Sequence, residues 1–165
     1  MRKSPGQNIM KQFGIMTHGL DSSQQGSMIV DNLNKLTQNN YDIDPILFYR
    51  EYHKPISTPY FTLMNDIEAW NFHHPVIATD VKSARRLLDC PGPSKKFLYI
   101  MNLEWLYINH AFSYETFAQV YTHDDLNLRA RSDEHAKIIT NCWKPPMAII
   151  KDFNEVGILE MLGYI

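Results

Sequence analysis

The feature that most constrains the fold of this chain is a regular alternation of strand-like and helix-like segments, separated by short polar stretches. Short apolar runs predict strands at residues 13–17, 45–49, 76–79, 97–101, 126–130 and 147–150. Apolar residues at helical spacing predict helices at residues 27–37, 60–70, 80–89, 114–122, 132–143 and 154–162, with a helical turn at 104–107. Such alternation is typical of βαβ units. We therefore predict an α/β fold, with a single Rossmann-like, doubly wound, mostly parallel sheet of about six strands.

The composition fits one domain with a substantial core. A length of 165 residues is typical of a single domain, and 44% hydrophobic and 12% aromatic residues supply the core. With 21% charged residues and a formal net charge of -2, the chain resembles neither a disordered segment nor a broadly basic nucleic-acid coat. We predict a flexible N-terminal segment at residues 1–10 and one Rossmann-like domain at residues 11–165.

Cysteine spacing and hydropathy both predict a cytoplasmic protein. Cys90 and Cys142 match no metal or redox spacing, so reduced thiols are favoured, although one disulfide is compatible with the sequence. The early apolar run at residues 13–16 is too short for a signal-peptide core or a membrane span.

In doubly wound sheets, ligands bind in the crevice beyond the carboxyl ends of the strands. This rule selects the polar stretches that follow the predicted strands, namely His18 with residues 19–26, and residues 49–51, 79–80, 102–104, 131–132 and 151–152. It places the acidic turn at residues 123–125 on the opposite edge, where a solvated turn is favoured over a metal site. The pair His73 and His74 lacks ligand spacing, so no metal site is predicted.

The loop at residues 19–26 is the most informative of these stretches. It joins a predicted strand to the start of a helix, so its backbone N–H groups can face an anion or a sugar hydroxyl. A plain strand-to-helix turn explains it equally well, because neither a dinucleotide fingerprint nor a phosphate-loop motif is present. The candidate binding residues in and beside this loop are Gly19, Ser22, Ser23, Gly26 and Ser27.

Two residues are candidates for a general base. Glu104 follows a predicted strand and precedes Trp105, and a carboxylate desolvated by that indole would have a raised pKa. The alternative, in which Glu104 caps the next turn and Trp105 packs in the core, is favoured from the sequence alone. His18, at the end of the first predicted strand, is the second candidate.

A local group of basic residues is a candidate surface for an anionic acceptor or partner. Three of its members share one face of the helix predicted at residues 80–89. A solvated outer helix face is the more common explanation of such a pattern. The group consists of Lys82, Arg85, Arg86, Lys95 and Lys96.

Taken together, these segments resemble the N-terminal domain of GT-B glycosyltransferases. Near the start, the resemblance rests on residues 14–19 (GIMTHG) and on Gly26 and Ser27. At the far end it rests on residues 128–132 (LRARS) and 148–154 (AIIKDFN). Residues 97–105 look like glycosyltransferase-like chains encoded by marine tailed phages.

The resemblance implies a specific function. Enzymes of this class hold the acceptor against the N-terminal domain and the nucleotide sugar mainly against the C-terminal domain, with catalysis in the cleft between them. By this resemblance, Gly19 and Gly26 would line the cleft and Ser132 would lie at its rim. His18 or Glu104 would deprotonate the acceptor, and a nucleotide sugar would be the co-substrate, with no metal or other cofactor.

The chain corresponds to about one such domain, so the resemblance implies that the donor-binding half is missing or that catalysis has been lost. We predict an acceptor-side half that is inactive as an isolated chain and works with a donor-binding partner chain or as a homo-oligomer, in the host cytoplasm if phage-encoded. The alternative is a non-catalytic phage accessory or virion interaction protein. Its candidate contact aromatics are Tyr60, Trp70, Phe72, Trp105, Tyr107 and Phe112.

Overall fold

The structure is a computed structural model that describes residues 10–39, 41–107 and 113–165. Within these residues, seven parallel strands form one sheet in the order β3-β2-β1-β4-β5-β6-β7. The strands are β1 (Lys11–Leu20), β2 (Ile43–Tyr52), β3 (Thr62–Asn65), β4 (Val76–Ala78), β5 (Lys96–Ile100), β6 (Leu126–Ala130) and β7 (Ala148–Ile149). The predicted Rossmann-like α/β fold is confirmed, with seven strands instead of about six. The segment predicted to be flexible lies outside the described residues, except for Met10.

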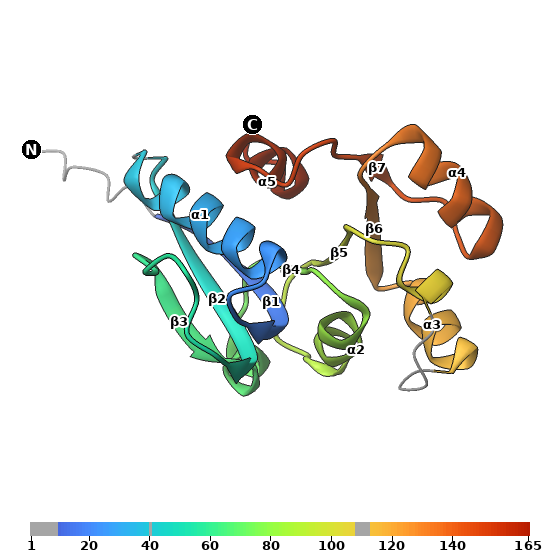
Figure 1. Cartoon of the computed structure of the whole chain (residues 1–165), viewed down its shortest axis with the longest axis horizontal. Coiled ribbons are helices and arrows are strands. Elements are labelled where there is room, and N and C mark those ends of the chain that lie inside the picture. Colours follow the sequence, from blue (N-terminus) through green and yellow to red (C-terminus); the bar gives the residue numbers. More distant parts are fainter. Residues whose placement is uncertain (1–9, 40, 108–112) are drawn as a thin grey trace, which may run out of the picture.

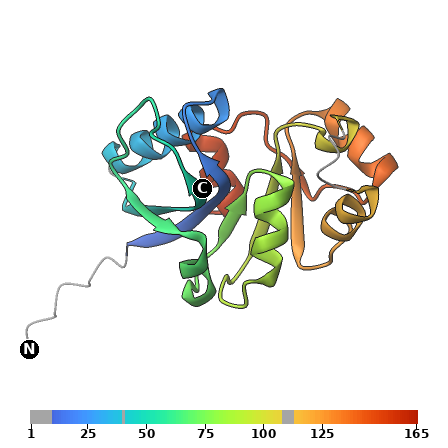
Figure 2. The same ribbon diagram turned by 60° about the horizontal axis from the view of Figure 1, so that its bottom comes forward.

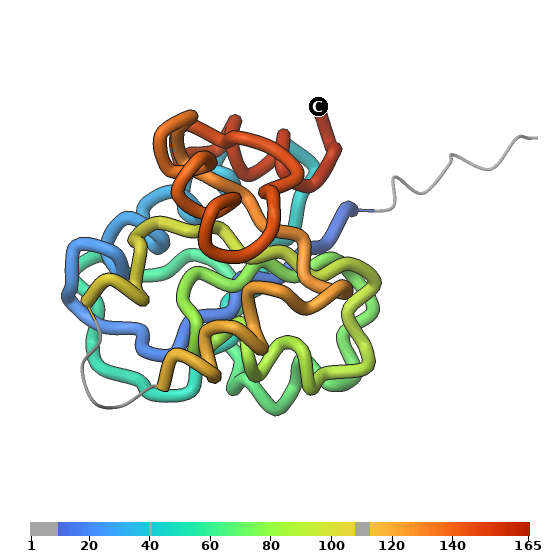
Figure 3. Tube along the Cα trace, turned by 90° about the vertical axis from the view of Figure 1, so that its right-hand side faces the viewer, coloured from blue at the N-terminus to red at the C-terminus, as the bar shows by residue number. Residues whose placement is uncertain are grey.

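Helices cover both faces of the sheet, as Figures 1 and 2 show. The α-helices are α1 (Gln24–Gln38), α2 (Val81–Asp89), α3 (Tyr114–Tyr121), α4 (Asp133–Cys142) and α5 (Glu155–Leu162), and the 3-10 helices are η1 (Asp66–Asn71) and η2 (Glu104–Tyr107). One core lies between the sheet and α1 with α5, and the other between the sheet and η1, α2, α3 and α4. Figure 3 shows the C-terminal segment, drawn in red, returning to the N-terminal half of the chain, where α5 contacts α1.

The order of the strands creates a switch point between β1 and β4. From β1 the chain adds β2 and β3 on one side, and from β4 it adds β5, β6 and β7 on the other. Because crossovers between parallel strands are right-handed, α1 and α2 leave these two neighbouring strands toward opposite faces. The carboxyl ends of β1 and β4 therefore border a crevice, which is where ligands bind in sheets of this kind.

The helix predicted at residues 60–70 is wrong. The chain there forms β3 and then η1, and β3 pairs in parallel with β2 from Thr62 opposite Ile46 to Asn65 opposite Tyr49. Leu63 and Met64 pack on opposite faces of the sheet, so a strand pattern and a following 3-10 turn together imitated a helical repeat. The Asn65 side chain marks the boundary by accepting a hydrogen bond from the N–H of Ile67 at 3.2 Å.

The first predicted strand is too short. β1 runs to Leu20 and includes His18 and Gly19, because Gly19 continues the ladder opposite Glu51 of β2. Helix α1 correspondingly begins at Gln24, three residues before the predicted start, and the connecting loop is residues 21–23 alone. In the described part of the chain, no helix is long and apolar enough to cross a bilayer.

A buried ion pair joins β2, η1 and α2 on the side of the sheet away from α1. The Asp66 side chain is 1% exposed, and its carboxylate forms an ion pair with the Nε of Arg86. Nη1 of Arg50, near the end of β2, lies 3.6 Å from the other carboxylate oxygen. The Arg86 and Arg50 side chains are 36% and 50% exposed, so solvent still hydrates both guanidinium groups when the carboxylate charge is removed.

Asp66→Asn is expected to lower the free energy of unfolding by about 1–3 kcal/mol, because the buried residue 66 loses its charge-assisted interaction with Arg86 while its shape is kept. Urea denaturation followed by circular dichroism measures this change. The matched control is Glu68→Gln, which neutralises an exposed carboxylate on the same 3-10 helix. Equal stability of the two variants would show that the Asp66 pair contributes nothing to the fold.

Candidate functional site

The switch point holds a crevice with a volume of about 270 Å³, which we term the β1–β4 crevice. It is lined by residues at the carboxyl ends of β1 and β2, by Asp80, which is the N-cap of α2, and by the loop before α1 with the first turn of that helix. Its most polar lining residues are Thr17, His18, Asp21, Glu51, His53 and Asp80. Two imidazoles and three carboxylates therefore converge where the fold places a ligand.

His18 is a partly exposed imidazole that lines this crevice. Its Nε2 lies 3.5 Å from Oε1 of Glu51, and the two side chains are 30% and 60% exposed. Its Nδ1 is buried and has no hydrogen-bond partner among the described residues. The ring thus presents Nε2 to the crevice, beside a carboxylate that can stabilise an imidazolium.

Asp80 fixes the end of β1 against the start of α2. Its Oδ2 accepts a hydrogen bond from the backbone N–H of His18 at 3.2 Å. Its Oδ1 accepts one from the N–H of Ser83 at 2.8 Å, and the Ser83 hydroxyl in turn accepts from the N–H of Asp80. This reciprocal arrangement is a capping box, which stabilises the first turn of α2. The backbone that carries His18 is therefore held by a side chain of the neighbouring strand–helix unit.

The start of α1 is already occupied by a carboxylate of the chain itself. Oδ1 of Asp21 accepts a hydrogen bond from the N–H of Ser23 at 2.8 Å, and hydrogen bonds with Ser23 lower the pKa of Asp21. The Ser23 hydroxyl caps the helix by accepting from the N–H of Gly26 at 3.1 Å. An external anion at this helix end would meet the charge of Asp21. The crevice therefore suits a hydroxyl group better than a phosphate.

The two glycines of the predicted binding loop have different roles. A Cβ at Gly26 would lie 2.5 Å from the carbonyl oxygen of Asp21, so glycine is needed there for the close approach of α1 to the loop. A Cβ at Gly19 would meet only Oδ2 of Asp21 within 4 Å, at 3.9 Å. Gly19 thus leaves open space inside the crevice, whereas Gly26 is required by packing.

The three remaining serines predicted to bind a ligand line neither the β1–β4 crevice nor the second hollow described next. Ser22 is exposed in the loop before α1, and Ser27 lies in the first turn of that helix. The Ser27 hydroxyl is buried, without a hydrogen-bond partner among the described residues. Ser132 is the N-cap of α4, and its hydroxyl accepts a hydrogen bond from the N–H of His135 at 3.1 Å.

Glu104 has the raised pKa expected of a base, but its carboxylate does not line the crevice. Burial, together with the negative charge of Asp80, raises the pKa of Glu104 to about 7. Its Oε1 accepts a hydrogen bond from the N–H of Val81 at 3.0 Å, in the first turn of α2. Trp105 packs in the core at 5% exposure. Glu104 therefore helps to cap α2 from inside the molecule, whereas His18 faces the crevice.

Two members of the basic group contact other parts of the chain. Arg86 is engaged with Asp66, and the ammonium of Lys96 donates to the carbonyl oxygen of Leu88 at 3.1 Å. Lys82, Arg85 and Lys95 are exposed. None of the five lines the β1–β4 crevice, so their proposed contact with an anionic acceptor would lie outside it.

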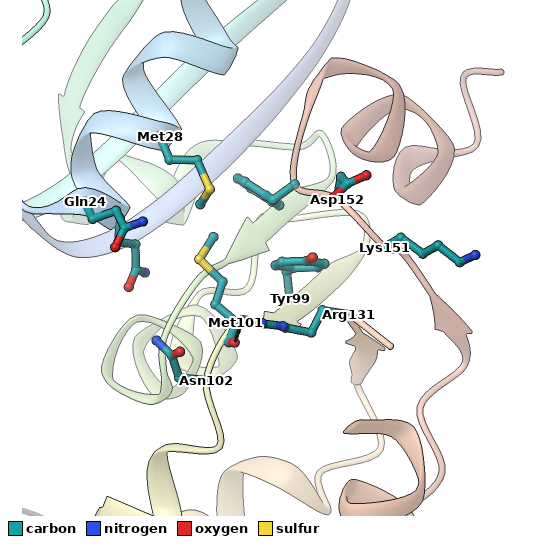
Figure 4. Close-up of a pocket in the computed structure, with 10 residues that line it drawn as sticks. Gln24, Met28, Tyr99, Met101, Asn102, Arg131, Lys151 and Asp152 are labelled. Atoms are coloured by element: carbon teal, nitrogen blue, oxygen red, sulfur yellow. Dashed lines mark hydrogen bonds between the residues drawn. The ribbon is translucent and has the colours of Figure 1, made fainter. Parts of the chain in front are cut away.

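A second hollow of about 340 Å³ lies along the same edge of the sheet, and Gln25 borders both. It lies between the first turns of α1 and the ends of β5, β6 and β7, as Figure 4 shows. We term it the β5–β6 hollow, and its main lining residues are Met28, Tyr99, Met101, Arg131, Lys151 and Asp152. The rule that ligands bind beyond the carboxyl ends of the strands had selected Arg131, Lys151 and Asp152 from the sequence. The sequence did not identify Met28, Tyr99 and Met101 as lining residues, because methionine and tyrosine at such positions usually belong to the core.

Comparison of the chain with protein-family models, with curated protein sequences and with solved structures found no match. The function is therefore argued from the geometry of the site. Across residues 10–39, 41–107 and 113–165, no group of three or more His, Cys, Asp and Glu side chains is arranged to hold a metal ion.

Gly26→Ala is expected to lower the free energy of unfolding by about 1–3 kcal/mol, because the added methyl group cannot fit against the Asp21 backbone. Gly19→Ala, in open space, is expected to leave it within about 1 kcal/mol. Urea denaturation of both variants makes this comparison. A Gly26→Ala protein as stable as Gly19→Ala would contradict the packing role of Gly26.

Glu104→Gln is expected to change how stability depends on pH. The folded protein holds the Glu104 proton more tightly than the unfolded chain, so wild-type stability falls as the pH rises from 4.5 to about 7. At about 1.4 kcal/mol per pKa unit, wild type should lose about 3 kcal/mol relative to the variant. Urea denaturation of both proteins from about pH 4.5 to about pH 8 measures the difference. A difference that stays constant with pH would contradict the raised pKa.

Proposed function

We propose that this chain is the acceptor-side half of a glycosyltransferase, which binds a hydroxyl-bearing acceptor in the β1–β4 crevice and uses His18 as the base. The observation that carries the proposal is the accessible His18 Nε2, 3.5 Å from the Glu51 carboxylate at the carboxyl edge of the sheet. The resemblance of residues 14–19 to GT-B enzymes supplies the reaction class, which the fold alone does not.

The charges of the crevice favour a neutral, polyhydroxylated acceptor. Asp21, Glu51 and Asp80 give the lining a negative character that disfavours phosphate groups. Carboxylates accept hydrogen bonds from sugar hydroxyls, and the open space at Gly19 admits a ring or a chain of hydroxyls. An acceptor that carries hydroxyls without charge therefore fits the crevice best.

In the proposed reaction, an acceptor hydroxyl donates a hydrogen bond to Nε2 of His18. As the hydroxyl oxygen forms a bond to the anomeric carbon of the donor, its proton passes to Nε2. The bond between that carbon and the phosphate oxygen breaks, and the nucleotide leaves with the bonding electron pair. The Glu51 carboxylate stabilises the resulting imidazolium, and general base catalysis of this kind contributes about 10²–10⁴ in rate.

The proposal assigns the donor to a separate domain, either a partner chain or a second copy. The nucleotide sugar would be presented across the crevice from His18, so the isolated chain would bind the acceptor without completing the transfer. The proposed compartment is the cytoplasm, of the host cell if the chain is phage-encoded. The absence of a disulfide between Cys90 and Cys142, both of which are free thiols, supports this setting.

His18→Gln is expected to reduce sugar transfer by about 10²-fold or more, because glutamine can keep a hydrogen bond but does not act as a base. The assay follows transfer from labelled nucleotide sugars to a panel of glycans, using protein purified from its native source together with any bound partner. Acceptor binding, read by saturation-transfer NMR, should weaken in Gly19→Ala and stay unchanged in His18→Gln. The control is Gln119→Ala, an exposed change on α3 outside the crevice.

Two results would contradict the proposal. One is saturable glycan binding that Gly19→Ala does not weaken, which would place the acceptor elsewhere. The other is full transfer activity in His18→Gln, which would exclude His18 as the base.

A second candidate function is a non-catalytic interaction domain, and one surface feature favours it. Ile67 and Trp70 are 62% and 49% exposed on η1. Residues three apart eclipse one another on a 3-10 helix, so both side chains lie on one face. Tyr60 and Tyr107 are exposed as well, whereas Trp105 is buried, Phe72 is half-buried, and Phe112 lies outside the described residues.

A further inference from the structure

The β5–β6 hollow differs in chemistry from the neighbouring β1–β4 crevice. Its base is formed by two aromatic side chains, Tyr99 and Phe153, which are buried with ring centroids 4.8 Å apart, whereas polar side chains line most of the rest of it. Met28 of α1 and Met101, just beyond β5, extend toward one another from opposite sides, as Figure 4 shows. Methionine side chains are flexible and polarisable, so a pair of them adapts well to a flat ligand.

Arg131 is one of three charged residues that line this hollow, together with Lys151 and Asp152. Its Nη1 donates a hydrogen bond to the carbonyl oxygen of Met101 at 2.9 Å, which fixes the guanidinium at the edge of the hollow. A guanidinium has five N–H groups, so one anchoring bond leaves donors for a ligand. In Figure 4 the Lys151 ammonium and the Asp152 carboxylate extend away from the space between the methionines, although both residues line the hollow. Two of the three charged lining residues are basic and one is acidic, so the lining has a net positive charge.

The opposite wall is the start of α1. Gln24 and Gln25 lie in its first turn and border the hollow. The Gln25 amide nitrogen donates to the carbonyl oxygen of Thr79 at 3.3 Å, which holds this side chain across the top of the sheet. An amide at this position can recognise the polar edge of a ring.

We propose that the β5–β6 hollow binds a small anion with a flat apolar body, of the size of a nucleoside monophosphate. Its flat body lies between Met28 and Met101, and its anionic group pairs with the guanidinium of Arg131. The volume of about 340 Å³ is near the lower end of the range for small-molecule sites, which suits one nucleotide unit and not two. The site is independent of the acceptor crevice, because none of its anchoring groups belongs to the His18–Glu51 pair.

Isothermal titration calorimetry of the purified full chain with AMP, CMP, GMP and UMP tests this site. At least one nucleotide is expected to bind saturably and more weakly at high salt, as a charge pair requires. Inorganic phosphate and the matching nucleoside each lack one of the two recognised features, so each should bind at least about tenfold more weakly.

Two variants locate the binding. Arg131→Gln is expected to weaken nucleotide binding about tenfold through loss of the charge-assisted hydrogen bond. Arg85→Gln, which removes the same charge from an exposed position on α2, should leave binding unchanged. Met28→Glu should abolish binding, because it places a negative charge where the flat body lies. Thermal melts confirm that each variant is folded.

Three results would overturn the proposal, namely no saturable binding of any nucleotide, equal binding by wild type and Arg131→Gln, or phosphate binding as tight as nucleotide binding. His18→Gln should bind nucleotide like wild type. Failure of this site would therefore leave the proposed acceptor chemistry untouched, and failure of sugar transfer would leave nucleotide binding at Arg131 standing.

Discussion

The carboxyl edge of the sheet depends on the hydrogen bonds that the Asp80 carboxylate accepts from two different elements. One of its oxygens caps α2 through Ser83, and the other accepts the backbone N–H of His18 at the end of β1. Because β1 is a strand of the sheet and α2 is a helix on one of its faces, no backbone ladder joins the two, and the Asp80 side chain supplies this link. The same charge also contributes to the raised pKa of Glu104, after desolvation. A single side chain thus holds the backbone of one candidate base and adds to the raised pKa of the other.

Access, and not pKa, separates the two candidate bases. Glu104 is largely buried, next to Trp105, which packs edge-on against Tyr121 with ring centroids 5.0 Å apart. Burial, together with the charge of Asp80, raises the pKa of Glu104 to about 7, and its carboxylate accepts a hydrogen bond from the N–H of Val81. His18 occupies the open side of Asp80, with its Nε2 beside Glu51. A base must reach its substrate before its pKa matters, which favours His18.

The sequence predicted the elements whose signals are local. The bounds of β6 are as predicted, and Ser132 caps α4, because an alternating apolar strand and an N-cap serine are read within a few residues. The helix predicted across β3 is wrong because residues 62–65 form a strand by pairing with β2. That partner is too distant in the sequence for a local hydrophobic pattern to include it. His18 and Gly19 were assigned to a loop for the same reason, since their strand conformation comes from pairing with β2. The rule that ligands bind beyond the carboxyl ends of the strands selected Asp80 and Arg131 from the sequence. Their contacts with His18 and Met101 join distant parts of the chain and could not be predicted in this way.

The two hollows together suggest why one edge of the sheet carries opposite charges side by side. The β1–β4 crevice is lined by Asp21, Glu51 and Asp80, whereas Arg131 gives the β5–β6 hollow a positive charge. Gln25 borders both hollows, and its side chain is neutral, so it adds no charge to either of them. A hydroxyl-bearing ligand is favoured on one side of Gln25 and an anion on the other, and exchanging them would place an anion against three carboxylates. The charge pattern of the edge would thus orient whatever binds across it.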